Sequence, residues 1–300
     1  MLEKQMIHNH PFTVKAIPRI GRERWNEVAE EARSERCPLV ITKLFSQASQ
    51  DWSPEKLAAQ WGDREVNVVV DLPAHGTPYK ERSNKYVQQI TLGEFIELLR
   101  AGKSCYLNQA PLHQYPYLLE NLAIKKLKLS RIFALNLWVG NKTRSGLHFD
   151  NADNLFGQIY GTKRVYLVSP AYSKYLYPFL DNPSKSQVDL EAPDMKKYPK
   201  SRQIEVWTYT LHPGDGLFMP RGWWHHICSN DISISVNCWH GESLTELEYL
   251  KMIFASGLPV LGRAVYDFVW HGLFKRPYEH RLFSPPSPGL TAYHKLILKR

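Results

Sequence analysis

The chain has 300 residues, of which 43% are hydrophobic and 12% aromatic, and this composition excludes a disordered tail and allows a full core. We expect one large domain with appendages rather than two equal domains. The formal net charge of +9 allows an acidic partner such as RNA, DNA or an acidic peptide surface. Solvated basic faces are the simpler explanation, because no known nucleic-acid-binding motif accompanies the lysine and arginine clusters.

Three features bear on the compartment. No apolar run reaches about 18 residues, so we expect no membrane span, and the N-terminus lacks the apolar core of a secretory signal. The four cysteines, Cys37, Cys105, Cys228 and Cys238, include no CxxC pair and do not indicate a disulfide framework. We therefore expect a cytoplasmic protein, or a nuclear one if the source is eukaryotic.

The first third of the chain mixes helix and strand signals. In chain order we expect an irregular start, a helix from Arg22 to Arg33, a buried strand over 38–41, a helix that begins after Ser53 at Pro54, a strand over 66–70, a polar mobile loop over 74–85, and an apolar helix after a capping box at Thr91 and Glu94. Residues 1–36 are interpreted as an N-terminal extension.

From residue 105 the pattern changes to short strands punctuated by Gly, Pro and Asn. Eight strands are expected, at 105–109, 132–139, 146–150, 155–160, 163–168, 205–210, 216–219 and 231–239. This predicts a mainly β fold, a double-stranded β-helix (jelly roll or cupin) with N-terminal and C-terminal helices beside it. We assign the core, with its N-terminal α/β elements, to 37–241 and a C-terminal helical region to 242–300, and we expect an insertion over 172–202.

A metal site is the main functional prediction. His148 and Asp150 stand two residues apart on an expected strand, so their side chains share one face. His225 follows the turn Pro220–Gly222, which ends another strand, and the Gly-Pro-Gly-His spacing matches the second metal motif of cupins. Two imidazoles and one carboxylate can occupy one face of an octahedral metal, and the open positions favour Fe(II), although Zn, Mn or Ni could bind. His226 is a rival for the third ligand.

A cationic anchor is expected close to this site. Lys163 opens the strand after the turn Gly161-Thr162, and in a hairpin its side chain can face the interior. A buried ammonium needs a partner, and the dicarboxylate 2-oxoglutarate could chelate iron at one end and pair with Lys163 at the other. A surface lysine is the alternative.

The last expected core strand has one polar face. Ser233, Ser235, Asn237 and Trp239 alternate with apolar residues, which suggests a barrel interior lined for a polar ligand. An ordinary amphipathic edge strand is the alternative. Asn154 and Tyr106 could add hydrogen bonds, and Trp239 could shield the metal.

Together these residues resemble the JmjC-type (cupin-8) Fe(II)/2-oxoglutarate-dependent oxygenases, and within them the asparaginyl hydroxylases related to factor inhibiting HIF. The likeness runs from about Pro38 to Gly241. It implies that His148, Asp150 and His225 bind iron and that Lys163 and Tyr106 hold the far carboxylate of 2-oxoglutarate. It further implies that the same site includes Asn154, Asn237 and Ser145, the last standing where those hydroxylases have a threonine.

One departure concerns the substrate. The asparaginyl hydroxylases carry an Arg-Gln pair just before Ser186-Gln187-Val188-Asp189, and its glutamine meets the target asparagine; this chain has Ser184-Lys185 there. The leading hypothesis is hydroxylation of a protein side chain. RNA (tRNA) or small-molecule hydroxylation, lysine demethylation and a non-catalytic cupin binding module are alternatives. The resemblance also suggests a homodimer through the C-terminal helices, which could equally pack on the barrel.

Overall fold

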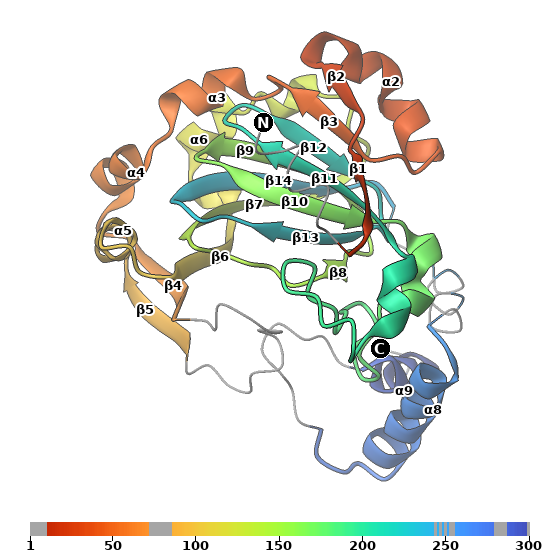
Figure 1. Cartoon of the computed structure of the whole chain (residues 1–300). Helices are drawn as coiled ribbons and strands as arrows, with labels where there is room; N and C mark the ends of the chain where they lie inside the picture. Colours follow the sequence, from red (N-terminus) through yellow and green to blue (C-terminus); the bar gives the residue numbers. More distant parts are fainter. Residues whose placement is uncertain are drawn as a thin grey trace.

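The computed structural model describes residues 11–71, 86–242, 256–278 and 287–298, together with the single positions 245, 248 and 251 (Figure 1). The expected loop over 74–85 and the expected helix start at Ser243 both lie outside these residues. Within the described residues, two β-sheets of nine and five strands face each other and form a mainly β fold, as predicted.

Eight strands form the double-stranded β-helix. They are β7 (Ile132–Asn141), β8 (His148–Phe149), β9 (Asp153–Tyr160), β10 (Lys163–Val168), β11 (Glu205–Leu211), β12 (Gly216–Met219), β13 (Trp224–Cys228) and β14 (Ser233–His240). They pair in the order β12-β9-β14-β7 in one sheet and β11-β10-β13-β8 in the other, and all these pairs are antiparallel. Successive strands switch between the sheets, except that β10 and β11 pair with each other in the smaller one. This alternation is what closes a jelly roll.

One predicted strand has a different place in the fold, and one strand was missed. The strand predicted at 105–109 is present as β6 (Cys105–Pro111), but it is not among the eight, because it extends the larger sheet beside β7. The missing member is β13, where we expected only a turn before His225. Four of its five residues are buried, so it lacks the alternation of apolar and polar residues that marks a half-exposed strand.

The remaining strands extend the two sheets. They are β1 (Thr13–Ala16), β2 (Arg19–Gly21), β3 (Leu39–Thr42), β4 (Glu65–Val70) and β5 (Val87–Thr91). β1 pairs in parallel with β11, and β2 pairs in parallel with β3. The N-terminal extension therefore contributes a strand to each sheet, while the domain boundary at residue 37 stays a prediction.

Helices cover the outer face of the larger sheet (Figure 1). They are α2 (Arg22–Ser34), α3 (Ser46–Asp51), α4 (Pro54–Trp61), α5 (Leu92–Arg100) and α6 (Pro116–Asn121), with 3₁₀ turns η3 (Leu112–Gln114) and η4 (Ile124–Lys126). Local signals fixed two of their starts. The Ser53 hydroxyl accepts a hydrogen bond from the backbone N–H of Lys56 (3.2 Å), and Thr91 and Glu94 form the predicted capping box.

Three apolar clusters hold these layers together. One lies between the sheets and includes Phe156, Leu167 and Leu217. A second lies between the larger sheet and its helices. The third lies on the outer face of the smaller sheet, where Phe149 and Trp224 pack under the segment 169–204. That segment contains the turns η5 (Pro170–Tyr175) and η6 (Pro199–Gln203) and, as expected, no named strand.

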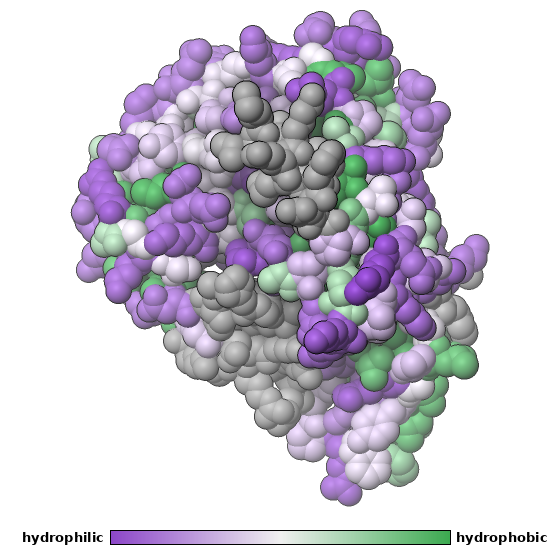
Figure 2. Space-filling model, in the orientation of Figure 1, coloured by the Kyte–Doolittle hydropathy of each residue, from purple (hydrophilic) through white to green (hydrophobic). Residues whose placement is uncertain are grey.

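The C-terminal helices form a separate pack below the sheets in Figure 1. They are α8 (Leu258–Asp267), the π-helical η7 (Phe268–Leu273) and α9 (Pro288–Leu296). Phe268 and Tyr293 meet edge to face, with ring centroids 5.7 Å apart. Several large apolar side chains stay exposed there, among them Leu258, Trp270 and Phe274, and hydrophobic residues reach the surface in this part of Figure 2.

Candidate metal centre and its surroundings

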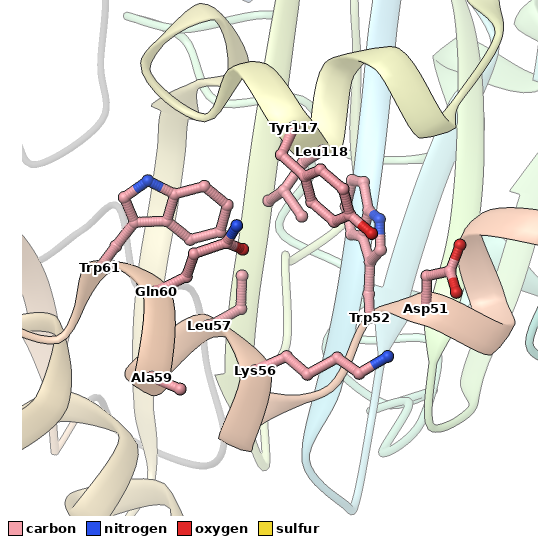
Figure 3. A pocket seen from close by; sticks show the side chains of 9 residues that line it. All are labelled: Asp51, Trp52, Lys56, Leu57, Ala59, Gln60, Trp61, Tyr117 and Leu118. Carbon is pink, nitrogen blue, oxygen red and sulfur yellow. The ribbon is translucent and has the colours of Figure 1, made fainter.

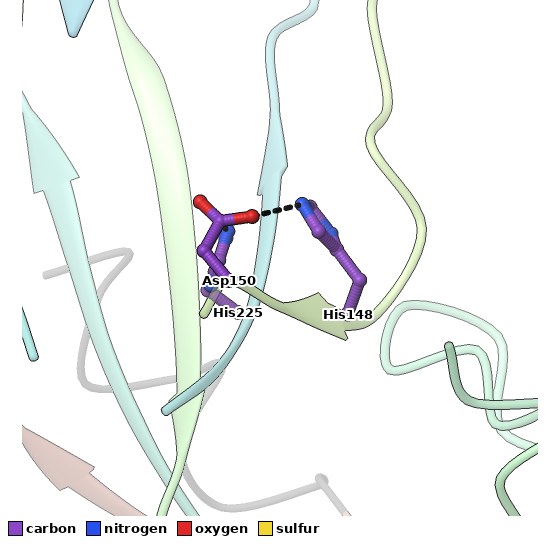
Figure 4. Close-up of side chains that lie close together, drawn as sticks. All are labelled: His148, Asp150 and His225. Carbon is purple, nitrogen blue, oxygen red and sulfur yellow. Dashed lines mark ion pairs between the residues drawn. The ribbon is translucent and has the colours of Figure 1, made fainter. Parts of the chain in front are cut away.

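Strand pairing brings the three predicted metal ligands together. β8 pairs with β13 so that His148 lies directly opposite His225, and Asp150 follows two residues after His148. The ligand atoms of the three side chains all lie within 4.8 Å of one another. His148 Nε2 is 4.0 Å from Asp150 Oδ1, and His225 Nε2 is 3.8 Å from Asp150 Oδ2 (Figure 4).

Backbone contacts fix the orientation of both imidazoles. Nδ1 of His148 lies 3.0 Å from the carbonyl oxygen of Gly146, and Nδ1 of His225 lies 3.1 Å from that of Trp223. A carbonyl accepts, so each Nδ1 carries the proton and each Nε2 presents a lone pair to the cluster. Burial is the largest cause that lowers the pKa of both histidines, and the charge of Lys185 lowers that of His148 further. Both rings are therefore held in the neutral form that a metal requires.

The rival ligand His226 points away from this cluster. Adjacent residues of a strand face opposite sides, so the side chain of His226 lies on the outer face of the smaller sheet. There its Nε2 is 2.8 Å from Oε2 of Glu191, which also receives Arg144 at 2.7 Å. His226 thus ties the segment 169–204 to β13.

Two side chains hydrogen-bond the carboxylate of Asp150. Trp239 Nε1 donates to Oδ2 at 2.9 Å, and Asn154 Nδ2 donates to the same oxygen at 3.3 Å. β14 lies between β9 and β7 in the middle of the larger sheet, so the alternative of an edge strand was wrong. Its polar face carries Trp239, which bonds Asp150 directly, and Asn237, which donates a hydrogen bond to Asn154.

Lys163 lies inside the barrel. Its side chain is only 2% exposed, and burial lowers its pKa to about 7. The ammonium Nζ lies 5.6 Å from the ring centroid of Tyr106 and 5.4 Å from that of Phe156, and it has no ion-pair partner among the described residues. We expected a hairpin turn before Lys163, and this was wrong: β9 and β10 belong to different sheets, so the turn crosses from one sheet to the other.

Ser145 is engaged by the backbone. Its hydroxyl donates to the carbonyl of Gly146 (3.0 Å) and accepts from the backbone N–H of Ile227 (3.0 Å). The expected contact with 2-oxoglutarate would require the hydroxyl to turn away from Gly146, and it stays a prediction.

Lys185 is a site residue that the sequence reasoning did not assign. The backbone of 184–186 pairs with that of 147–149 and places Lys185 directly opposite His148. Opposed residues of an antiparallel pair share a face, so Lys185 continues the row formed by His225 and His148. Burial lowers its pKa to about 8, against the opposing effect of the Asp150 charge. The departure at Ser184-Lys185 was the available signal.

A cavity away from this cluster lies between α4 and α6 (Figure 3). It measures about 300 Å³, and the rings of Trp61 and Tyr117 form part of its walls. Lys56 and Asp51 are the charged residues among those that line it. This set has no imidazole or thiol and one carboxylate, so it does not resemble a metal site.

The donor set at His148, Asp150 and His225 fits a divalent transition metal. Both nitrogens are neutral, the carboxylate is oriented by two donors, and all three come from one end of the barrel. With metal–ligand bonds of about 2.1 Å, neighbouring donors stand about 3 Å apart, so a small inward rotation of the side chains suffices. Three ligands on one side leave positions open opposite them.

These features define a cupin with a His/Asp/His cluster, and the chain belongs to the family described as cupin-like domain, whose model matches residues 25–246. It is 34% identical over 200 residues to lysine-specific demethylase 8 of Xenopus tropicalis (63% of this chain, 44% of the relative). It is 30% identical over 217 residues to lysine-specific demethylase JMJ30 of Arabidopsis thaliana (67% and 49%). It is also similar to JmjC domain-containing protein A of Dictyostelium discoideum, with 27% identity over 225 residues (69% and 88%). The chain spans about half the length of the first two relatives.

Two further observations concern the cysteines and the helices. All four cysteines are free thiols in the structure. Among the described residues, every helix is too short or too polar to cross a bilayer.

Proposed function

We propose that the chain is an Fe(II)- and 2-oxoglutarate-dependent dioxygenase that hydroxylates a protein side chain. The observation that supports this best is the pairing of the His/Asp/His cluster with a buried, unpaired ammonium. His148, Asp150 and His225 would hold the iron, and Lys163 with Tyr106 would hold the far carboxylate of 2-oxoglutarate.

The spacing of these two parts suits the cosubstrate. Leu167 lies opposite His225, and Lys163 is four residues earlier on the same strand and on the same face. Four residues of strand span roughly 13 Å. An extended lysine side chain and a five-carbon dicarboxylate together bridge such a distance. Asn154 and Asn237 would line the space between them.

The reaction needs both partners. Bound iron and 2-oxoglutarate would supply the oxidation: one oxygen atom of O₂ enters a substrate C–H bond as hydroxyl, and the other enters succinate as carbon dioxide leaves. The chain contributes the geometry. The imidazoles stay neutral because of burial and their backbone contacts, Lys163 neutralises the far carboxylate, and Trp239 orients Asp150.

Lys185 bears on the choice of substrate. Its side chain shares the face of His148, so it lies beside the place where a substrate carbon must approach. An amine donor there favours an amide or carboxylate side chain over a methylated ammonium. Two relatives are named lysine-specific demethylases, and removal of a methyl group begins with the same hydroxylation, so demethylation is the competing reaction. The net charge of +9 supports RNA as a second substrate class.

The test is consumption of 2-oxoglutarate with O₂ and Fe(II), in the presence of protein extracts or of RNA. We expect succinate to form only aerobically, and mass spectrometry to find protein peptides that gain one oxygen atom. Asp150→Ala is the matched control. Succinate no higher than in that control would leave a non-catalytic binding module, and release of formaldehyde would establish demethylation.

The same proposal includes two features of the whole protein. We infer that it acts in the cytoplasm, or in the nucleus of a eukaryote, and forms a homodimer through the C-terminal helices. Support for the dimer comes from the exposed apolar side chains of α8, η7 and α9, since surfaces of this kind mark interaction sites.

A further inference from the structure

A chain of buried hydrogen bonds leads from Asp150 into the larger sheet. Asn154 Nδ2 donates to Asp150 Oδ2 (3.3 Å), and Asn237 Nδ2 donates to Asn154 Oδ1 (3.3 Å). Asn237 Oδ1 in turn accepts from Trp138 Nε1 (2.7 Å) and from Asn136 Nδ2 (3.1 Å). Five side chains are thereby linked in one network that branches at Asn237, and we call it the amide relay.

Strand register explains why these side chains meet. Asn136 lies directly opposite Asn237 on neighbouring strands β7 and β14. Asn154 on β9 lies opposite Trp239 on β14, two residues from Asn237. Residues two apart share a face, so the three asparagines all point into the barrel. They are 8%, 4% and 1% exposed for Asn136, Asn154 and Asn237, so bulk water does not compete for their hydrogen bonds.

The two ends of the relay fix the direction of every bond in it. An indole N–H can only donate, so Trp138 requires the oxygen of Asn237 on its side. The nitrogen of Asn237 must then face Asn154, which presents its oxygen there and its nitrogen to Asp150. An ionised carboxylate can only accept, so the far end agrees with this assignment. Flipping either asparagine would place two donors or two acceptors against each other.

We propose that Trp138 and Asn136 are positioning residues for the metal carboxylate, acting through Asn237 and Asn154. All donors in the relay point toward Asp150, and bonds aligned in this way strengthen one another in a buried setting. The relay and the indole of Trp239 together keep Oδ2 occupied and leave Oδ1, the atom nearest His148, free to turn toward the metal. This inference rests on the proposed metal site.

The relay also borders the cosubstrate anchor. The ring of Trp138 lies 5.6 Å from that of Tyr106, and Tyr106 in turn lies 5.6 Å from the ammonium of Lys163. Residues that orient the metal ligand and residues expected to hold 2-oxoglutarate therefore share one wall. The proposal nevertheless concerns metal affinity alone, which can be measured without the cosubstrate.

The test is a double-mutant cycle on the binding of Mn(II), followed by the electron paramagnetic resonance signal of free Mn(II). Trp138→Phe removes the indole donor and keeps a ring. We expect it to raise the Kd for Mn(II) roughly threefold to tenfold, the effect of one neutral hydrogen bond. In the Asn154→Ala background, where the relay is already broken, the same change should have less than a twofold effect.

The matched control is Trp207→Phe, which removes an indole donor to Glu205 Oε1 (2.6 Å) in the smaller sheet. Its Kd should stay within twofold of the parent. If Trp138→Phe does not fold, Asn136→Ala removes the second donor to Asn237 with a smaller loss of volume, and it should raise the Kd about threefold. An unchanged Kd in the variant that folds overturns the proposal.

Two other outcomes are informative. An equal effect of Trp138→Phe in both backgrounds would mean that Trp138 acts independently of Asn154, and the relay would be refuted. Failure of the unmodified chain to bind Mn(II) at all would refute the proposed metal site itself, so the two failures are distinguishable.

Discussion

Replacing Lys163 by methionine should both stabilise the protein and strongly weaken cosubstrate binding. The ammonium is 2% exposed and unpaired among the described residues, and burial lowers its pKa from 10.5 to about 7. At about 1.36 kcal/mol per pKa unit, keeping the charge buried costs up to about 4 kcal/mol near pH 7. Relaxation and entering water reduce that cost, so we expect Lys163→Met to gain about 1–3 kcal/mol in unfolding free energy.

The sign of the pH dependence follows from this lowered pKa. Between pH 7 and 10.5 the unfolded chain keeps the lysine proton that the native protein has lost, so the native state gains stability as pH rises. The advantage of Lys163→Met should therefore be largest below pH 7 and fade toward pH 10. Urea unfolding of metal-free protein at pH 7 and pH 10 measures both values, with the exposed Lys125→Met as the control.

Cosubstrate affinity should change in the opposite direction. An ammonium–carboxylate pair about 4 Å apart is worth about 4 kcal/mol at an effective dielectric constant of 20. Lys163→Met should therefore weaken 2-oxoglutarate binding to the Mn(II) protein roughly a hundredfold to a thousandfold, as measured by calorimetry. In the parent protein the affinity should fall as pH rises above 7, because the ammonium deprotonates. If Lys163→Met binds 2-oxoglutarate within twofold of the parent, this role is refuted. If the variant is less stable than the parent, the argument from the buried charge is refuted.

Three further predictions concern other parts of the molecule. Asp150→Ala should weaken Mn(II) binding at least a hundredfold and remove the increase in melting temperature that Mn(II) causes in the parent protein. A chelator should reverse that increase in the parent. An increase that persists in the variant would contradict the ligand assignment. Burial raises the pKa of Glu191, but the hydrogen bond and charge of His226 and the charge of Arg144 bring it down to about 2, so its contribution to stability should be lost as pH falls from 4.5 to 2. Glu191→Gln should accordingly lower the unfolding free energy by about 2 kcal/mol at pH 7, with the difference closing in acid and the Kd for Mn(II) unchanged within twofold; a large loss of metal affinity would show that His226 belongs to the metal site. Phe274→Asp should convert a dimer into a monomer of 34.8 kDa by light scattering, because it places a charge in an exposed apolar surface, and a monomeric parent would refute the dimer.

Much of the site could be predicted from the sequence because the information is local. The spacing of His148 and Asp150 places both side chains on one face of any strand, and the turn Pro220–Gly222 marks where a strand ends before His225. The alternation of β14 likewise separates its polar from its apolar face. Ser53 and Thr91 fixed helix starts for the same reason, since a capping side chain binds backbone groups only two or three residues away.

Tertiary structure alone decided which faces meet. β13 has no period-two pattern because both of its faces are buried, so only its pairing with β8 shows that His225 stands opposite His148 and that His226 turns outward to Glu191. Lys185 enters the site through a backbone pairing with residue 148. Asn136 and Asn154 are linked through Asn237, which lies 101 and 83 residues away from them along the chain. Such contacts depend on sheet order and register, which are set by packing of the whole core, and no short segment of sequence encodes them.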